Sequence, residues 1–254
     1  MRGVLIFTAL ALALAACGPK PQAGSQATST APAAPASVDP ASLNGHIIAR
    51  GEGWTLDEDA KAGFVFAMPA QHISLTAAHA AATRDGLGAK LTSGGLTLSL
   101  TPQACTFAGV AYPMTADIET PRGVQHGCAV VRWDHDLITL LPGIDACLAQ
   151  ATEPMSVTYA APENNGEFVR LKLDEESFDC HAPSDANAQA SMEPASETHY
   201  PGENDAVFVR APGDNPGGDC YQAPEVRATD GTLIGWWDEP RGCPSARREN
   251  SDGD

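Results

Sequence analysis

The sequence predicts a mainly β (α+β) fold: a small disulfide-linked β domain, then a helix-plus-hairpin module, then a related C-terminal module. Three observations support this prediction. The 254 residues include 24 Gly and 20 Pro, which favours many turns and short strands over long helices. Short stretches alternate apolar and polar residues with the period of a β-strand. Seven cysteines are present, and six of them lie in the part of the chain that we expect to fold.

The first 17 residues are typical of a lipoprotein signal peptide. Arg2 precedes an apolar run over 4–14, which is too short to span a bilayer. The segment ends in Leu-Ala-Ala-Cys at 14–17, which resembles the lipobox of bacterial lipoproteins. The resemblance implies cleavage after residue 16, lipid on Cys17 and attachment to a membrane. The alternative is an ordinary secretory signal with an incidental cysteine.

The residue after Cys17 suggests a location. Gly18 stands where an Asp would favour retention in the inner membrane of Gram-negative bacteria. By that resemblance we expect a cell-envelope protein on the outer membrane, facing the periplasm. Residues 17–45 are rich in Ala, Pro and Ser and have little to bury, so we expect a flexible tether. Residues 244–254 are expected to form a disordered tail.

Residues 46–133 are predicted to form the first β domain. Strand patterns occur at 63–69, 96–102, 112–119 and 127–133. The stretch 74–86 is ambiguous, because its alanines favour a helix although it lies between strands.

A resemblance covers about ninety residues of this domain. The segments "LTLSLTPQAC", "AYPMTADIE" and "HGCAVV" resemble a family of uncharacterised bacterial envelope lipoproteins with a small META-like β domain. The family's early G-T-E-P-F-W motif is represented only by "GEGW", with Gly51, Glu52 and Trp54. The resemblance implies a β fold, an envelope location and pairing of Cys105 with Cys128, and it makes Trp54 part of a candidate binding surface. It implies no reaction.

The second region, 134–183, is predicted to hold a short helix from about Pro142 and strands at 155–160, 167–173 and 177–182. The acidic run 174–176 is typical of a hairpin turn. Residues 184–205 are polar and are expected to form a linker or loop. Residues 206–243 repeat a Phe-Val-Arg…Asp-Cys pattern found in 168–180, which predicts a related module. Its Trp236 and Trp237 are a candidate binding platform, although packing in the core is the simpler interpretation.

Six cysteines without Cys17 indicate disulfides in an oxidising compartment. Fifteen pairings are possible, and sequential pairing is the simplest: Cys105–Cys128, Cys147–Cys180 and Cys220–Cys243. The adjacent Cys180 and His181 leave a metal site or a catalytic thiol as alternatives, but no second ligand pair at zinc-binding spacing follows, and a nucleophile would have to stay reduced. We therefore expect a structural disulfide.

No motif for catalysis, nucleotide binding or metal binding is present, and we expect no metal and no cofactor. An Asp- and Asn-rich stretch is explained by turns better than by calcium. The net charge of −17 argues against nucleic acid as a partner and favours a cationic protein. We expect a non-enzymatic binding or structural protein of the envelope. The alternatives are a lysozyme-inhibitor-like binder of a cationic protein and an envelope hydrolase whose catalytic pair only the fold would reveal.

Overall fold

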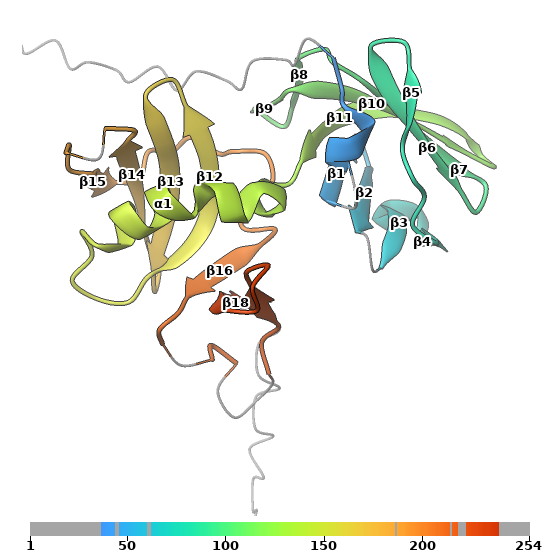
Figure 1. Cartoon of the computed structure of the whole chain (residues 1–254). Helices are drawn as coiled ribbons and strands as arrows, with labels where there is room; N and C mark the ends of the chain where they lie inside the picture. The colour runs from blue at the N-terminus through green and yellow to red at the C-terminus, as the bar shows by residue number, and fades with distance from the viewer. Residues whose placement is uncertain are drawn as a thin grey trace, which may run out of the picture.

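The computed structural model describes residues 37–43, 46–59, 62–185, 187–213, 215–217 and 222–238. The described part of the chain is mainly β with one α-helix, which confirms the predicted fold class. It forms two large antiparallel sheets, each with its own core, and a separate two-stranded hairpin (Figure 1). The signal peptide, Cys17, most of the tether, Cys220, Cys243 and the C-terminal tail lie outside the described residues.

The first sheet has nine strands in the order β4-β3-β2-β1-β11-β10-β7-β6-β5. A separate hairpin, β8–β9, is inserted before β10, and short 3-10 helices occur at Pro40–Leu43 and Pro69–Gln71. The strands are β1 (His46–Gly51), β2 (Trp54–Asp59), β3 (Gly63–Met68), β4 (Ile73–Ala77), β5 (Thr83–Asp85), β6 (Gly88–Ser93), β7 (Leu96–Thr101), β8 (Cys105–Phe107), β9 (Val110–Tyr112), β10 (Met114–Thr120) and β11 (Gly123–Val131).

Alternation along the strands creates the first core. In β7, Leu96, Leu98 and Leu100 are all buried, and the residues between them are more exposed. The sheet curls so that the β6–β7 turn reaches β4. A Cβ atom on Gly94, which has φ of +56°, would lie 2.6 Å from the Cβ of Ala77, so this contact requires glycine. The curled sheet therefore surrounds its own core.

The ambiguous alanine-rich stretch is not helical. Residues 78–82 are irregular, and Thr83–Asp85 forms β5. Ala80 and Ala82 pack against the first core. Packing across the core between β4 and β5 thus overrides the helical propensity of alanine.

The second sheet has seven strands in the order β15-β14-β13-β12-β16-β18-β17. Figure 1 shows α1 lying across β12, β13 and β14. After a 3-10 helix at Trp133–Asp136, the elements are α1 (Leu137–Leu148), β12 (Ser156–Glu163), β13 (Gly166–Leu173), β14 (Glu176–Pro183), β15 (Ser191–Pro194), β16 (Val207–Arg210), β17 (Glu225–Arg227) and β18 (Leu233–Asp238).

The helix begins earlier than the sequence suggested. It starts at Leu137, so Pro142 lies inside it and not at its first turn. The apolar residues Leu137, Leu140 and Ile144 are buried against the sheet, which favours helix through the proline. The N–H of Gly143 donates to Glu167 Oε2 of β13 at 2.8 Å, which fixes the helix to the sheet.

The second sheet includes strands from segments that were expected to be separate. β16, from the segment 206–243, pairs with β12 and extends the same sheet. Ser191–Pro194, from the segment 184–205, pairs with β14 as β15. The acidic residues Asp174 and Glu175 form the β13–β14 turn, since Leu173 pairs with Glu176.

Two disulfides are present. Cys105 is bonded to Cys128 and Cys147 to Cys180, with Cα atoms 5.6 and 5.9 Å apart. These are two of the three pairings that the sequence favoured. The second bond joins α1 to β14 inside the second core, and each bond shortens the loops that the unfolded chain can explore.

Arg170 lies at the centre of a buried ionic network. Its side chain, 3% exposed, donates from Nε to Asp179 Oδ1 at 2.8 Å and from Nη2 to Asp179 Oδ2 at 3.0 Å. Its Nη1 donates to Glu203 Oε1 at 3.1 Å and to the carbonyl oxygen of Thr198 at 2.6 Å. The Tyr200 ring lies 4.9 Å from the guanidinium carbon. Arg170 therefore holds the segment 196–203 against the sheet.

The same segment contacts the first sheet. Gly202 lies against Ile48 of β1 and Val130 of β11, so that an added Cβ would be 3.3 Å from Ile48 Cδ1. Asp205 Oδ2 lies 3.6 Å from Arg50 Nη2. On the opposite side, Tyr200 stacks on Tyr159 of the second sheet with ring centroids 4.7 Å apart. Residues 200–205 thus lie between the two sheets.

A second ionic contact is found where the chain passes from one sheet to the other. Arg132 donates to both carboxylate oxygens of the buried Asp134, at 2.9 and 2.5 Å. His46 Nδ1, from β1, lies 3.2 Å from Asp134 Oδ2. Burial alone would raise the pKa of Asp134, but the bonds from Arg132 and the nearby His46 outweigh it and lower the pKa to about 2.

We expect Arg170→Met to reduce the free energy of unfolding by about 3–5 kcal/mol, because Asp179 and Glu203 would lose the cation that compensates their burial. Urea unfolding followed by circular dichroism measures the change. The matched control is Arg227→Met, which removes an exposed pair with Glu225 and should change little. Equal losses in the two variants would contradict the role assigned to Arg170.

Asp134→Asn is expected to cost about 2 kcal/mol at pH 7, the linkage value of a pKa lowered from 3.8 to about 2. A lowered pKa stabilises the folded protein above the unfolded pKa, and this contribution is lost as pH falls toward 2. The difference between wild type and variant should therefore shrink between pH 4 and pH 2 in urea titrations. Asp136→Asn, at a 71% exposed side chain, is the control. A difference that does not depend on pH would contradict the assignment.

Candidate functional site

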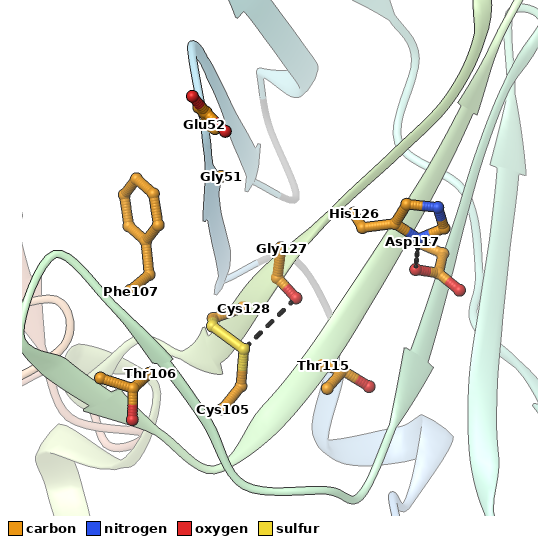
Figure 2. Close-up of a pocket in the computed structure, with 10 residues that line it drawn as sticks. All are labelled: Gly51, Glu52, Cys105, Thr106, Phe107, Thr115, Asp117, His126, Gly127 and Cys128. Atoms are coloured by element: carbon orange, nitrogen blue, oxygen red, sulfur yellow. Dashed lines mark hydrogen bonds and ion pairs between the residues drawn. A yellow bond between two sulfur atoms is a disulfide. The ribbon is translucent and has the colours of Figure 1, made fainter.

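An open groove of about 650 Å³ lies on the outer face of the first sheet (Figure 2). Its lining comes from three places: the β1–β2 turn, strand β8, and the paired strands β10 and β11. The lining residues are Gly51, Glu52, Cys105, Thr106, Phe107, Thr115, Asp117, His126, Gly127 and Cys128.

One wall of the groove is the β8–β9 hairpin. Its two-residue turn, Ala108 and Gly109, has φ angles of 50° and 82°, as a tight hairpin requires. The two strands pair with each other and not with the nine-stranded sheet. The Cys105–Cys128 disulfide ties β8 to β11. The covalent bond therefore holds in place a wall that sheet pairing does not.

The indole of Trp54 packs beneath the floor of the groove. Trp54 was expected on a binding surface, but it is only 2% exposed. The indole packs beneath Gly51 and Gly127. A Cβ on Gly51 would lie 2.1 Å from Trp54 Nε1, and one on Gly127 would lie 2.6 Å from Trp54 Cζ2. The indole Nε1 also donates to the carbonyl oxygen of His126 at 3.3 Å. Trp54 therefore supports the groove from the core, while Gly51 and Glu52 of the same motif line it.

The ionisable groups of the groove are Glu52, Asp117 and His126. Asp117 and His126 face each other across β10 and β11, and Asp117 Oδ1 lies 2.6 Å from His126 Nδ1. All three residues are exposed. The sequence analysis did not single out Asp117 or His126 as site residues. Their pairing has a sequence signal. Asp117 lies three residues before Thr120 and His126 three residues after Gly123, and Thr120 and Gly123 flank the β10–β11 turn, so the two side chains are opposite each other in an antiparallel hairpin.

The groove places a histidine beside a carboxylate. Such a pair can act as a general base on a side-chain nucleophile or on water. Among the described residues, none with a hydroxyl or thiol hydrogen-bonds to the His126 ring, and both sulfur atoms in the groove belong to the disulfide. The His126 side chain is 77% exposed, so water competes for its ring nitrogens. Two carboxylates in an open groove are suited to holding a cation.

The remaining candidate residues do not form a site. Trp236 is 6% exposed, and Trp237 packs against the second core, edge-on to Trp133 with centroids 5.9 Å apart, so the two rings do not form the candidate binding platform. Cys180 has no free thiol, and His181 Nδ1 lies 3.0 Å from Glu163 Oε2 instead. Among the described residues, no group of three or more His, Cys, Asp or Glu has an arrangement that would hold a metal ion.

A buried acid lies in the first core. Glu58 points inward from β2 in the alternation that also buries Trp54 and Leu56, and its Oε1 contacts His79 Nδ1. Burial raises the pKa of Glu58, and His79 only partly offsets this. Its Oε2 atom is buried without a hydrogen-bond partner among the described residues. Neither residue lines the groove; Glu58 is buried in the first core, whereas the His79 side chain is 31% exposed.

No helix in the described part of the chain is both long enough and apolar enough to cross a membrane. Comparison with known proteins finds no matching family model, no matching curated protein and no matching solved structure.

Proposed function

We propose that the protein is a non-enzymatic, lipid-anchored protein of the bacterial cell envelope that binds a basic segment of a partner protein in the groove. The observation that carries the proposal is the open groove of about 650 Å³, with the carboxylates Glu52 and Asp117 on opposite parts of its lining. Lysine and arginine side chains are the natural counterparts of carboxylates in such a setting.

The charge of the whole chain supports the same partner class. A net charge of −17 creates a field that attracts cationic proteins and repels nucleic acid. Such a field accelerates encounter, whereas contacts in the groove decide which segment stays bound. A cationic lysozyme is one protein of this class, and its inhibition in the envelope would be a specific form of the proposed function.

The envelope location rests on the N-terminal pattern and on the disulfides. The segment ending at Cys17 resembles a lipoprotein signal, and disulfides form in oxidising compartments. With lipid on Cys17 in the outer membrane, residues 17–45 would connect the anchor to the first sheet, which carries the groove.

Lipidation predicts that Cys17→Ser abolishes incorporation of labelled palmitate, and that globomycin makes the unprocessed precursor accumulate in an expressing Gram-negative host. Gel mobility and labelling measure both effects. The control is Cys105→Ser, which removes a cysteine far from the signal and should leave labelling intact. Normal processing in the presence of globomycin would contradict lipidation.

The groove predicts salt-sensitive binding of a cationic lysozyme to the purified full chain in mild detergent. The double variant Glu52→Gln with Asp117→Asn should weaken binding roughly tenfold, because two charge-assisted contacts are lost. Calorimetry at low and moderate salt measures the affinity, which should fall as salt screens the charges.

The matched control for this experiment is Glu153→Gln with Glu175→Gln. It changes the net charge by the same amount at two exposed residues outside the groove. If both double variants weaken binding equally, attraction is general and the groove is not the site. An absence of binding to the lysozyme and to a basic peptide alike would contradict the proposal.

A further inference from the structure

We propose that the occupant of the groove is an extended segment that pairs as a β-strand with the free edge of β8 and carries basic side chains at alternate positions. This inference rests on the proposed function and adds the mode of recognition. It begins from the hydrogen-bonding pattern of the β8–β9 hairpin.

The hairpin register leaves one residue of β8 with its main chain turned outward. Phe107 pairs with Val110 across the two-residue turn, Thr106 with Ala111, and Cys105 with Tyr112. In a hairpin of this kind the pair next to the turn exchanges hydrogen bonds, and the next pair does not. The N–H and C=O of Thr106 therefore point away from β9.

That outward edge faces the groove. All three residues of β8 line the groove, and no residue of β9 does. No described residue forms a hydrogen bond with the main chain of Thr106. A partner strand on this side of β8 would thus find an available donor and acceptor, as in other cases where a peptide extends a sheet edge.

The groove sets the chemistry of the added strand. Alternate side chains of a strand point to the same face, so basic residues at alternate positions would all face the groove, which Glu52 and Asp117 line from opposite sides. Phe107 is half-buried on the same wall and offers an aromatic face to a cation or an apolar neighbour. The partner class is therefore an extended basic segment, not a folded basic surface.

The other described sheet edges are less suited to this role. β5 and β17 carry charged side chains of both signs along three-residue strands, and β15 ends at Pro194, features that discourage strand addition. β4 lies against the β6–β7 turn at Ala77 and Gly94. β8 contains no charged residue or proline and borders a groove.

The test measures binding of a short peptide of alternating lysine and valine to the full chain in mild detergent. Thr106→Pro removes the outward N–H without touching a hairpin hydrogen bond, and it should weaken binding about fivefold to tenfold. The matched control, Ala111→Pro, removes the equivalent N–H on the far side of the hairpin and should leave the affinity unchanged.

A second measurement does not depend on how the variants fold. The same peptide with every backbone nitrogen methylated keeps its charges but loses the donors of both edges, and it should not bind to the wild-type chain. Equal binding of methylated and unmethylated peptides, still sensitive to Glu52→Gln with Asp117→Asn, would overturn strand pairing and leave the proposed function standing. Failure of every basic probe would overturn both.

Discussion

The relative placement of the two sheets depends on the burial of one guanidinium group. A buried arginine needs anions and carbonyl oxygens around it, and the neighbouring strand supplies only Asp179. The rest comes from a segment with little regular structure of its own, through Glu203 and the Thr198 carbonyl. Such a network adds little net free energy over apolar packing, but it favours one arrangement over others. Here it determines where residues 196–203 lie, and therefore which face of the first sheet Gly202 and Asp205 contact.

A different constraint builds the groove. The indole of Trp54 fills the core beneath β1 and β11, and it fits only because Gly51 and Gly127 have no side chains. Because Gly51 and Gly127 have no side chains, the outer surface of the sheet is recessed at these two residues. The disulfide holds the β8–β9 hairpin beside this recess as a wall. Packing in the core and a covalent bond outside it thus produce a hollow where a twisted sheet would otherwise present a continuous row of side chains.

Local patterns in the sequence predicted the mainly β fold, the β13–β14 turn at Asp174 and Glu175 and the two observed disulfides, because alternation, turn chemistry and cysteine parity act over short distances. They failed where distant contacts decide. The start of α1 depends on burial of Leu137 against the second sheet, and the role of residues 200–205 depends on Arg170. Trp54 was placed on a candidate surface, and a binding platform stayed open for Trp236 and Trp237, because residue type alone does not reveal which face of a strand is buried.

The candidate site could likewise not be predicted from composition, because it depends on strand register. The chain has 32 acidic residues, so acidity pointed to a cationic partner without indicating a place. The antiparallel pairing of β10 with β11 sets Asp117 opposite His126, and the β1–β2 turn brings Glu52 to the same groove. Among the described residues, two carboxylates line that groove, and its wall at β8 is a strand edge with an outward donor and acceptor. General attraction is shared by every acidic surface, so in the proposed function specificity would come from this combination of charge and main-chain hydrogen bonding, which the sheet topology creates and the composition does not reveal.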